Sequence, residues 1–210
     1  MYYINNKDNT DPWINLALEE FTVRYMDSSR DYILLYVNQP CLIIGKHQNV
    51  VEEVNLKIAA EMDIPIIRRI SGGGSVYHDS GNLNISYITN HTLKNFNKYS
   101  NFLKPVLEVL NELTLSAELN ERNNIILNDK KISGNAQFTS KQRMLSHGTL
   151  LIDSDLKKMD QLIKPENNTA YKSKSTKSVR STVTNINNHL NNKIHVDEFR
   201  KSVLDKIFGR

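Results

Sequence analysis

The chain has 210 residues, of which 39% are hydrophobic and 24% are charged, and its formal net charge at pH 7 is +4. That length fits one domain, and the apolar fraction is sufficient for a packed core. No apolar run approaches the roughly 20 residues that a transmembrane helix needs, and no signal peptide is apparent. The single cysteine, Cys41, excludes a disulfide within the chain and favours a cytoplasmic location.

The first third of the chain predicts helices alternating with strands. Asp11-Pro12 is typical of a helix start, because aspartate caps helices and proline is favoured at their first position. In the helix that follows, four apolar residues recur on one face, namely Ile14, Leu18, Phe21 and Tyr25. Further on, the sequence predicts strands over 32–37, 41–44 and 64–70, and a helix over 52–62.

The rest of the chain adds strands and two amphipathic helices. A helix over 99–113 contains Pro105, so it either begins shortly before that residue or is kinked there. Asn128-Asp129-Lys130 between two short apolar runs predicts a hairpin turn. We also expect a strand over 82–88, a strand within 144–153 that His147-Gly148 interrupts, a polar loop over 164–182 and a final helix over 196–207. Together these elements indicate one α/β or α+β domain over 1–210, with a largely antiparallel sheet flanked by helices.

Three consecutive glycines mark the first candidate site. Gly72, Gly73 and Gly74 lie between two predicted strands. Without Cβ atoms, the backbone N–H groups of such a loop can approach an anion closely. A plain glycine-rich hairpin is the alternative, but Arg69 before the loop and His78 after it favour a phosphate or carboxylate site.

A lysine and a second histidine mark two further segments. Lys131 precedes a run of small residues, Ser133-Gly134-Asn135-Ala136, which leaves room for a ligand. Such a lysine suits phosphate binding or polarisation of a carbonyl, although a solvated edge lysine is the common alternative. For His147, the surrounding residues by themselves favour a structural role. The chain has no Walker-type loop and no metal-ligand cluster, so the residues favour activation of a phosphorylated or carboxylated small molecule and leave the reaction open.

The excess positive charge is concentrated in residues 172–180, which include Lys177 and Arg180. A solvated loop is the usual explanation of such a run. The functional interpretation is a docking surface for an acidic partner, because a local positive potential attracts negatively charged proteins. Nucleic acid is disfavoured as the partner, since no aromatic residues alternate with the lysines.

Four segments resemble the sequence blocks of lipoate–protein ligases, and they occur in the order typical of that family. They are residues 68–82, which contain the triple glycine, and residues 131–137, 147–151 and 178–186. The resemblance extends from about Asn15 to the end of the chain. It implies a fold shared with biotin–protein ligases, in which helices surround a mixed sheet.

The resemblance also implies a two-step reaction. Lipoate and ATP, with magnesium, form lipoyl-adenylate and pyrophosphate, and the lysine of a carrier domain then displaces AMP. The implied carriers are the E2 subunits of 2-oxoacid dehydrogenases and the glycine-cleavage H protein. Lys131 is the implied catalytic residue, and Lys177 and Arg180 are candidates for acceptor docking. The implied substrate- and nucleotide-binding residues are Arg69, Ser71, Gly72, Gly73, Gly74, Ser75, Val76, Tyr77, His78, Asn124, Ser133, Gly134, His147 and Thr149.

Two features depart from the family pattern. An Arg-Asn-Asp run usually precedes the lysine motif, whereas this chain has Arg122-Asn123-Asn124, which lacks the acidic group expected to help hold magnesium. Many members also continue into a small C-terminal domain that these 210 residues do not include. Three explanations are open: truncation, a separate accessory subunit as in some archaeal two-chain ligases, and a protein that performs only part of the reaction.

Three other functions are weighed against the ligase. An octanoyl or lipoyl transferase of the same fold works through an acyl–cysteine, but no cysteine lies between Ser116 and Lys131. Biotin ligation is disfavoured because the chain has no Gly-Arg-Gly-Arg-type loop. A non-catalytic subunit that binds lipoate or its adenylate, and needs a partner chain, is the alternative from a different class.

Overall fold

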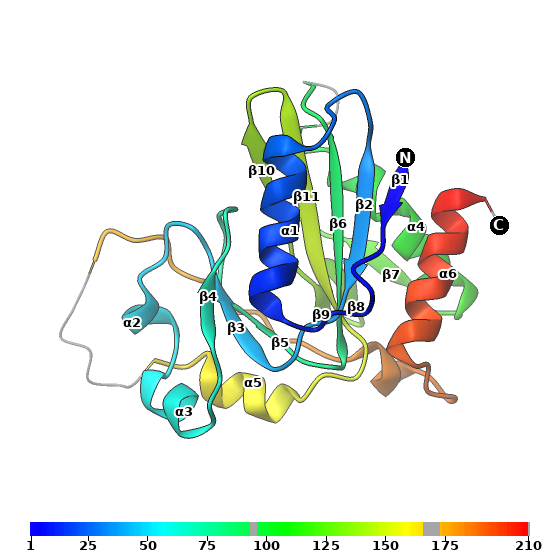
Figure 1. Ribbon diagram of the computed structural model, residues 1–210. Coiled ribbons are helices and arrows are strands. Elements are labelled where there is room, and N and C mark those ends of the chain that lie inside the picture. Colours follow the sequence, from blue (N-terminus) through cyan, green and yellow to red (C-terminus); the bar gives the residue numbers. More distant parts are fainter. Residues whose placement is uncertain (93–95, 166–172, 210) are drawn as a thin grey trace.

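The computed structural model describes residues 1–92, 96–165 and 173–209. A five-stranded sheet with the order β1-β2-β6-β11-β10 lies at its centre (Figure 1). β1 pairs with β2 in parallel, and the other neighbours pair antiparallel. The strands are β1 (Tyr2–Ile4), β2 (Tyr32–Tyr36), β6 (Asn82–Asn90), β10 (Asn135–Ser140) and β11 (Arg143–Leu151).

Two three-stranded sheets adjoin the central one. The first has the order β4-β3-β5 and carries the glycine loop between β4 and β5; the second, β7-β8-β9, carries Lys131. Within the first sheet, β3 pairs in parallel with β4 and antiparallel with β5. Their strands are β3 (Cys41–Ile44), β4 (Ile66–Arg68), β5 (Val76–His78), β7 (Ala117–Leu119), β8 (Ile125–Leu127) and β9 (Lys130–Ser133).

Helices cover both faces of the central sheet (Figure 1). α4 and α6 pack on one face in the main hydrophobic core, where Val106, Leu110, Phe199 and Val203 are fully buried against Ile33. α1 lies on the other face. None of the helices in the described ranges is long and apolar enough to cross a membrane. The helices are α1 (Pro12–Tyr25), α2 (Val50–Glu53), α3 (Leu56–Glu61), α4 (Tyr99–Glu112), α5 (Leu156–Leu162) and α6 (Val196–Phe208), with a 3-10 helix, η1 (Ile186–His189).

Local sequence signals are confirmed where a few neighbouring residues determine the structure. A carboxylate oxygen of Asp11 accepts hydrogen bonds from the N–H groups of Trp13 (2.8 Å) and Ile14 (3.2 Å), so Asp11 caps α1. Asn128 and Asp129 have φ angles of 49° and 60°, as expected for the two central residues of a hairpin turn. The mixed, mainly antiparallel α+β architecture is also confirmed.

Other expectations were wrong in their boundaries. The helix predicted over 52–62 is two helices, because the Asn55 side chain accepts from the Ile58 N–H (3.1 Å) and starts α3 anew. β11 is not interrupted at His147-Gly148, since both residues pair with β6 and with β10. The strand predicted over 64–70 spans Ile66–Arg68 only. The helix predicted over 99–113 is α4, which contains Pro105 and so does not begin shortly before it. β1, β5, β7, β10 and α5 were not predicted, and part of the loop expected over 164–182 lies outside the described residues.

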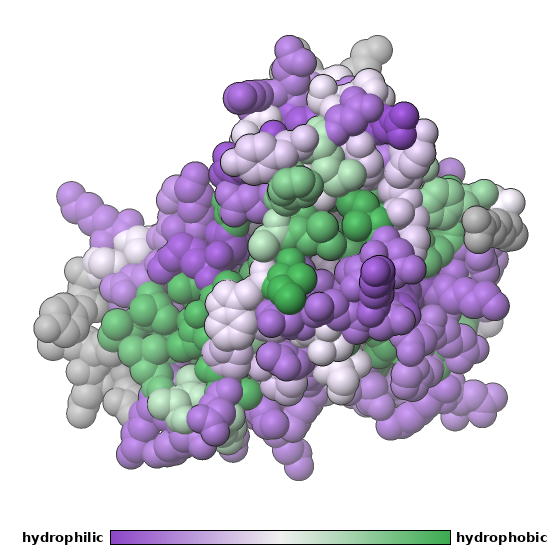
Figure 2. All heavy atoms as spheres, in the orientation of Figure 1, coloured by the Kyte–Doolittle hydropathy of each residue, from purple (hydrophilic) through white to green (hydrophobic). Residues whose placement is uncertain are grey.

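The apolar face of α1 is turned to solvent. Ile14, Phe21 and Tyr25 are 50%, 54% and 73% exposed, whereas Asn15 and Glu19 are buried at 0% and 1%. Figure 2 shows hydrophobic residues gathered over the outer side of this helix. Helical periodicity therefore predicted which residues share one face of α1, but it did not predict which face of the helix is buried. The face of α1 that points towards the central sheet is polar, and the residues beneath that face form a candidate binding site.

Candidate active site

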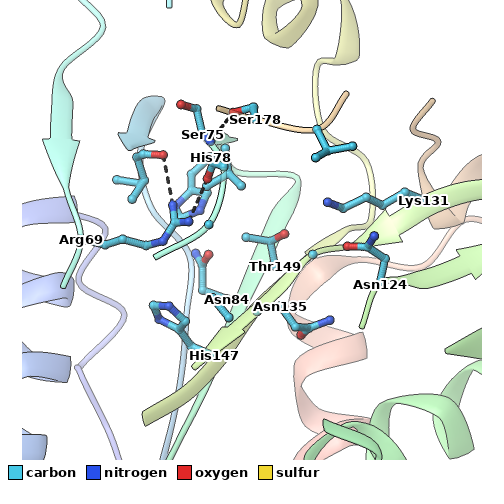
Figure 3. Close-up of a pocket in the computed structure, with 18 of the residues that line it drawn as sticks. Arg69, Ser75, His78, Asn84, Asn124, Lys131, Asn135, His147, Thr149 and Ser178 are labelled. Atoms are coloured by element: carbon cyan, nitrogen blue, oxygen red, sulfur yellow. Dashed lines mark hydrogen bonds between the residues drawn. The ribbon is translucent and has the colours of Figure 1, made fainter. Parts of the chain in front are cut away.

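Two cavities with a common wall lie among the glycine loop, β9 and β11. The first has a volume of about 360 Å³ and reaches the inward face of α1 at Glu19; the second has a volume of about 560 Å³ and extends towards α5. Lys131, Gly134 and Thr149 line both cavities, so a ligand group at their junction touches these residues. Figure 3 shows Lys131 and Arg69 pointing towards each other from opposite sides of the first cavity.

The glycine loop wraps around the buried guanidinium of Arg69. One terminal nitrogen of Arg69 donates to the carbonyl oxygens of Gly72 (2.7 Å) and Gly74 (2.8 Å), and Nε donates to the Ser71 hydroxyl (3.0 Å). Burial lowers the pKa of Arg69 to about 10, which leaves it cationic at neutral pH. Most of its donors are thus used by the protein, and Arg69 holds the shape of the loop.

Gly45 at the end of β3 allows the loop to lie where it does. A Cβ atom at Gly45 would be 2.1 Å from the carbonyl oxygen of Gly73, closer than real Cβ atoms approach. Gly73 itself has a φ of +94°, a conformation that other residues rarely adopt. The path of the loop therefore depends on a glycine that lies 27 residues before Gly72 in the sequence.

The backbone of Lys131 is hydrogen-bonded to the segment 182–184. Its N–H donates to the Thr182 carbonyl (2.9 Å), and its carbonyl accepts from the Thr184 N–H (3.0 Å). The side chain is half-buried over Gly134, and its Nζ has no hydrogen-bond or ion-pair partner within the described part of the chain. Burial lowers the pKa of Lys131, and the positive charge of Arg69 lowers it further. This unpaired ammonium suits an anionic ligand.

Two glutamates of α2 hold the segment 173–178 against the glycine loop. Glu52 accepts from the Ser173 N–H (3.0 Å) and from Lys177 Nζ (2.8 Å), and Glu53 accepts from the Ser178 N–H (3.1 Å). The Ser178 hydroxyl then accepts from the Ser75 N–H (3.0 Å). Hydrogen bonding to Lys177, and then to Ser173, lowers the pKa of Glu52 well below its usual range. The segment forms one wall of the first cavity.

A ladder of amide side chains orients His78. Asn15 donates to the Asn38 side-chain oxygen (2.8 Å), so the Asn38 nitrogen faces Nδ1 of His78 (3.0 Å). Nδ1 therefore accepts, and in the neutral ring the proton is on Nε2. Burial lowers the pKa of His78 to about 3, and the charge of Arg69 contributes in the same direction. His78 is neutral in the folded protein at ordinary pH.

This neutrality predicts a pH-dependent stability. An unfolded chain binds a proton at His78 near pH 6.5, whereas the folded chain binds it only near pH 3. Between these values the unfolded state holds more protons, so stability is lost as the pH falls. We expect the His78 share of the loss between pH 7 and pH 5 to be about 2 kcal/mol, from roughly 1.4 kcal/mol per pKa unit.

The measurement is urea denaturation at the two pH values. The fall in the free energy of unfolding should be smaller by that amount in His78→Gln than in the wild type. His47→Gln, at an exposed histidine, makes the same substitution and should retain the wild-type dependence. An equal fall in all three proteins would contradict the assignment of a buried neutral His78.

The cavities bring together most of the residues singled out in the sequence. The first is lined by Arg69, Gly73, Gly74, Ser75, Val76, His78, Asn124, Lys131, Gly134, His147, Thr149 and Lys177, and the second adds Tyr77, Ser133 and Arg180. Gly72 and Ser71 line neither cavity. Ser71 is instead buried between Arg69 and His147. Lys177 is paired with Glu52, whereas Arg180 is exposed without a partner in the described ranges.

Sequence reasoning missed several residues of the site. Glu19, Tyr36 and Asn84 line the first cavity, and Glu52 and Glu53 hold its wall. The polar stripe of α1, opposite its apolar face, was the available signal for Glu19. No local signal identified the α2 glutamates, because their partners are more than 100 residues away in the chain.

The site combines a glycine loop with a strand lysine that faces it across the first cavity, and both belong to a mixed α+β fold. These features define the class of protein. The family model for the lipoyl protein ligase A/B catalytic domain matches residues 11–208, so the chain belongs to that family. Among curated relatives, lipoate-protein ligase LplJ of Bacillus subtilis is 46% identical over 209 residues, covering 100% of this chain and 63% of the relative. The chain thus spans less than two thirds of the length of that relative.

Solved structures agree with this assignment. The crystal structure of P. falciparum LipL1 in complex with lipoate has a TM-score of 0.81 and 26% identity, and covers 100% of this chain and 59% of that one. The crystal structure of lipoate-protein ligase A bound with ATP has a TM-score of 0.80 and 25% identity, and covers 95% of this chain and 80% of that one. The fold predicted from the resemblance is confirmed.

Proposed function

We propose that this chain carries the site that activates lipoate with ATP and transfers the lipoyl group to a carrier lysine. The observation that carries the proposal is the Nζ of Lys131, which lies at the junction of the two cavities and has no partner among the described residues. Membership of the lipoyl ligase family supports the reaction class. The lipoate-bound and ATP-bound relatives support the two substrates.

In this proposal lipoate occupies the first cavity, and the nucleotide occupies the second with its phosphates at the junction, where Ser75 and Val76 of the glycine loop line both cavities. Leu16, Ile43 and Val76 supply apolar walls for the acyl chain in the first cavity. A lipoate carboxylate oxygen at the junction attacks the α-phosphorus of ATP, and the bond to pyrophosphate breaks. Lys131 neutralises charge on the carboxylate and phosphate, and the N–H groups of the glycine loop orient the phosphate.

The second step uses the same junction. The amine of the carrier lysine attacks the carbonyl carbon of the adenylate, the bond to the AMP oxygen breaks, and the amine loses a proton. Lys131 stabilises negative charge on the carbonyl oxygen and on the departing AMP. We propose that the carriers are lipoyl domains of E2 or H protein. We also propose that Arg180, which lines the second cavity and has no partner in the described ranges, contributes to their docking.

The cavities do not by themselves fit a magnesium ion held by the protein. Magnesium is usually bound by one or two carboxylates together with substrate phosphates. Glu19 is the carboxylate that lines the first cavity, and it already accepts hydrogen bonds from protein donors. Asp160 is the carboxylate that lines the second cavity, and it pairs with Lys164. Beside Lys131 the structure offers the neutral amide of Asn124. We therefore assign no step to a metal ion.

An added carboxylate at this place should change the magnesium requirement. In Asn124→Asp we expect the magnesium concentration for half-maximal pyrophosphate release to fall several-fold, because an anionic oxygen replaces a neutral one next to the phosphate site. The measurement is a magnesium titration of lipoate-dependent pyrophosphate release.

Asn120→Asp is the matched control. It adds the same charge in the same turn and retains the acceptor oxygen for the N–H groups of Arg122 and Asn124. This control should retain the wild-type magnesium dependence. Equal curves for Asn124→Asp and the wild type would contradict the place that we assign to Asn124.

An acyl–cysteine transferase is the second candidate, and the state of Cys41 argues against it. Cys41 is the only cysteine, it is fully buried, and burial raises the pKa of its thiol to about 12. Such a thiol is a poor nucleophile. One free cysteine is also compatible with the reducing cytoplasm, where we propose that the protein acts.

The deciding experiment supplies lipoate, ATP and a carrier domain, and follows pyrophosphate and carrier mass separately. Lipoylated carrier that requires ATP supports the proposal. Carrier modification from an acyl thioester without ATP would identify a transferase. Pyrophosphate release without carrier modification would limit the chain to the first step and indicate that an accessory subunit is needed. Binding of lipoate without either product would identify a non-catalytic subunit.

A further inference from the structure

A buried carboxylate on the inward face of α1 ends a chain of hydrogen bonds that leads to the glycine loop. Glu19 is 1% exposed and accepts from the Tyr36 hydroxyl (3.0 Å) and from the Ser86 hydroxyl. Both of its oxygens lie 3.1 Å from Nδ1 of His147. Three side chains thus contact the Glu19 carboxylate and hold it in one orientation.

His147 carries the connection across the cavity floor. Its Nε2 lies 2.7 Å from the Ser71 hydroxyl, and the same hydroxyl accepts from Nε of Arg69 (3.0 Å). Arg69 in turn donates to the carbonyl oxygens of Gly72 and Gly74. We call Glu19, His147, Ser71 and Arg69 the relay. It joins α1, β11 and the glycine loop. Arg69 makes the short contacts to the loop carbonyls, and the Ser71 hydroxyl adds a longer one to the Gly72 carbonyl (3.4 Å).

The relay also balances charge inside the protein. Arg69 is 8% exposed and forms no direct ion pair within the described residues, so its buried charge needs a nearby anion. Glu19 is the carboxylate at the other end of the relay. Burial alone would raise the pKa of Glu19, but His147 and the Ser86 and Tyr36 hydroxyls outweigh burial and lower it. Glu19 therefore remains ionised.

We propose that Glu19 is a positioning residue for the nucleotide. Acting through His147 and Ser71, it holds the Arg69 guanidinium and thereby the backbone N–H groups of the glycine loop in the arrangement that receives phosphate. This inference rests on the proposed function, because it assumes that the loop binds the phosphates of ATP. Glu19→Gln retains the size of the side chain but removes the charge and replaces one acceptor oxygen with a donor, which breaks the relay.

The test is a double-mutant cycle between the two residues that His147 separates. We expect Glu19→Gln and Ser71→Ala each to lower kcat/KM for ATP at least tenfold in lipoate-dependent pyrophosphate release, mainly through KM. The kcat/KM of the double variant should be within about twofold of that of the more damaged single variant, because the effects of coupled residues do not add. Independent effects would instead multiply to about a hundredfold.

Glu20→Gln is the matched control, because it makes the same substitution on the solvent side of α1, where Glu20 pairs with Arg24. It should retain the wild-type KM for ATP. A merely structural role of Glu19 would lower the folded fraction, read from thermal unfolding, and leave the KM for ATP of the folded enzyme unchanged. That result, or an additive cycle, would overturn the relay.

If Glu19→Gln does not fold, Ser71→Ala tests the relay by itself. We expect this variant to fold, because it removes only one hydroxyl from a loop. An unchanged KM for ATP in that variant would also overturn the relay. Failure of the proposed function looks different. In that case the wild type itself releases no pyrophosphate with lipoate and ATP.

Discussion

Lys131→Met is expected to lower lipoate-dependent pyrophosphate release by about 10²–10³-fold, the usual cost of removing one donor that stabilises charge in a transition state. The physical reason is the position of its Nζ, which lies over Gly134 at the junction of the two cavities without a protein partner in the described ranges. Methionine retains a long apolar stem but cannot neutralise the phosphate. The fold should tolerate the change, because a half-buried charge is removed.

Lys130→Met is the matched control for this variant. Lys130 precedes Lys131 on β9 and is exposed, because successive residues of a strand point to opposite faces. Pyrophosphate release at saturating ATP and lipoate, together with thermal unfolding, separates lost chemistry from lost structure. Turnover of Lys131→Met within a few-fold of the wild type would remove Lys131 from the catalytic role.

Gly45→Ala should be nearly as damaging, although Gly45 does not line either cavity. The new Cβ would meet the Gly73 carbonyl oxygen at 2.1 Å, and backbone at that distance must move. The glycine loop would be displaced from the phosphate site, and we expect pyrophosphate release to fall roughly 10²-fold, as for a lost donor. We expect this displacement to be confined to the loop, so the melting temperature should fall less than it does in a variant whose new Cβ clashes with the end of a strand.

Gly81→Ala provides the contrast. Its Cβ would lie 2.2 Å from the Asp153 carbonyl, where the chain follows β11 and cannot move independently of the fold. This variant should lose stability together with activity. A Gly45→Ala protein with wild-type kinetics would show that the loop does not need its close contact with β3.

The sequence predicted those parts of the molecule that neighbouring residues control. The start of α1 follows from Asp11-Pro12, and the β8–β9 hairpin follows from Asn128-Asp129, because capping and turn conformations depend on residues a few positions apart. The sequence also predicted Gly73, Gly74 and Lys131 as site residues, and the structure places all three around the first cavity. The four blocks in family order also predicted the family, which the comparisons confirm.

Tertiary structure alone decided how these parts meet. Short strands such as β1, β5 and β10 depend on partners elsewhere in the chain, and their sequences carry little periodicity. The exposure of the apolar face of α1 could not be predicted from the sequence. Helical spacing shows which residues share a face of the helix, but it does not show which face packs against the rest of the protein. Glu19 and His147 are 128 positions apart, and Gly45 meets Gly73 through space. The sequence by itself determined which groups perform the proposed chemistry, whereas packing between distant segments decided what holds them in place.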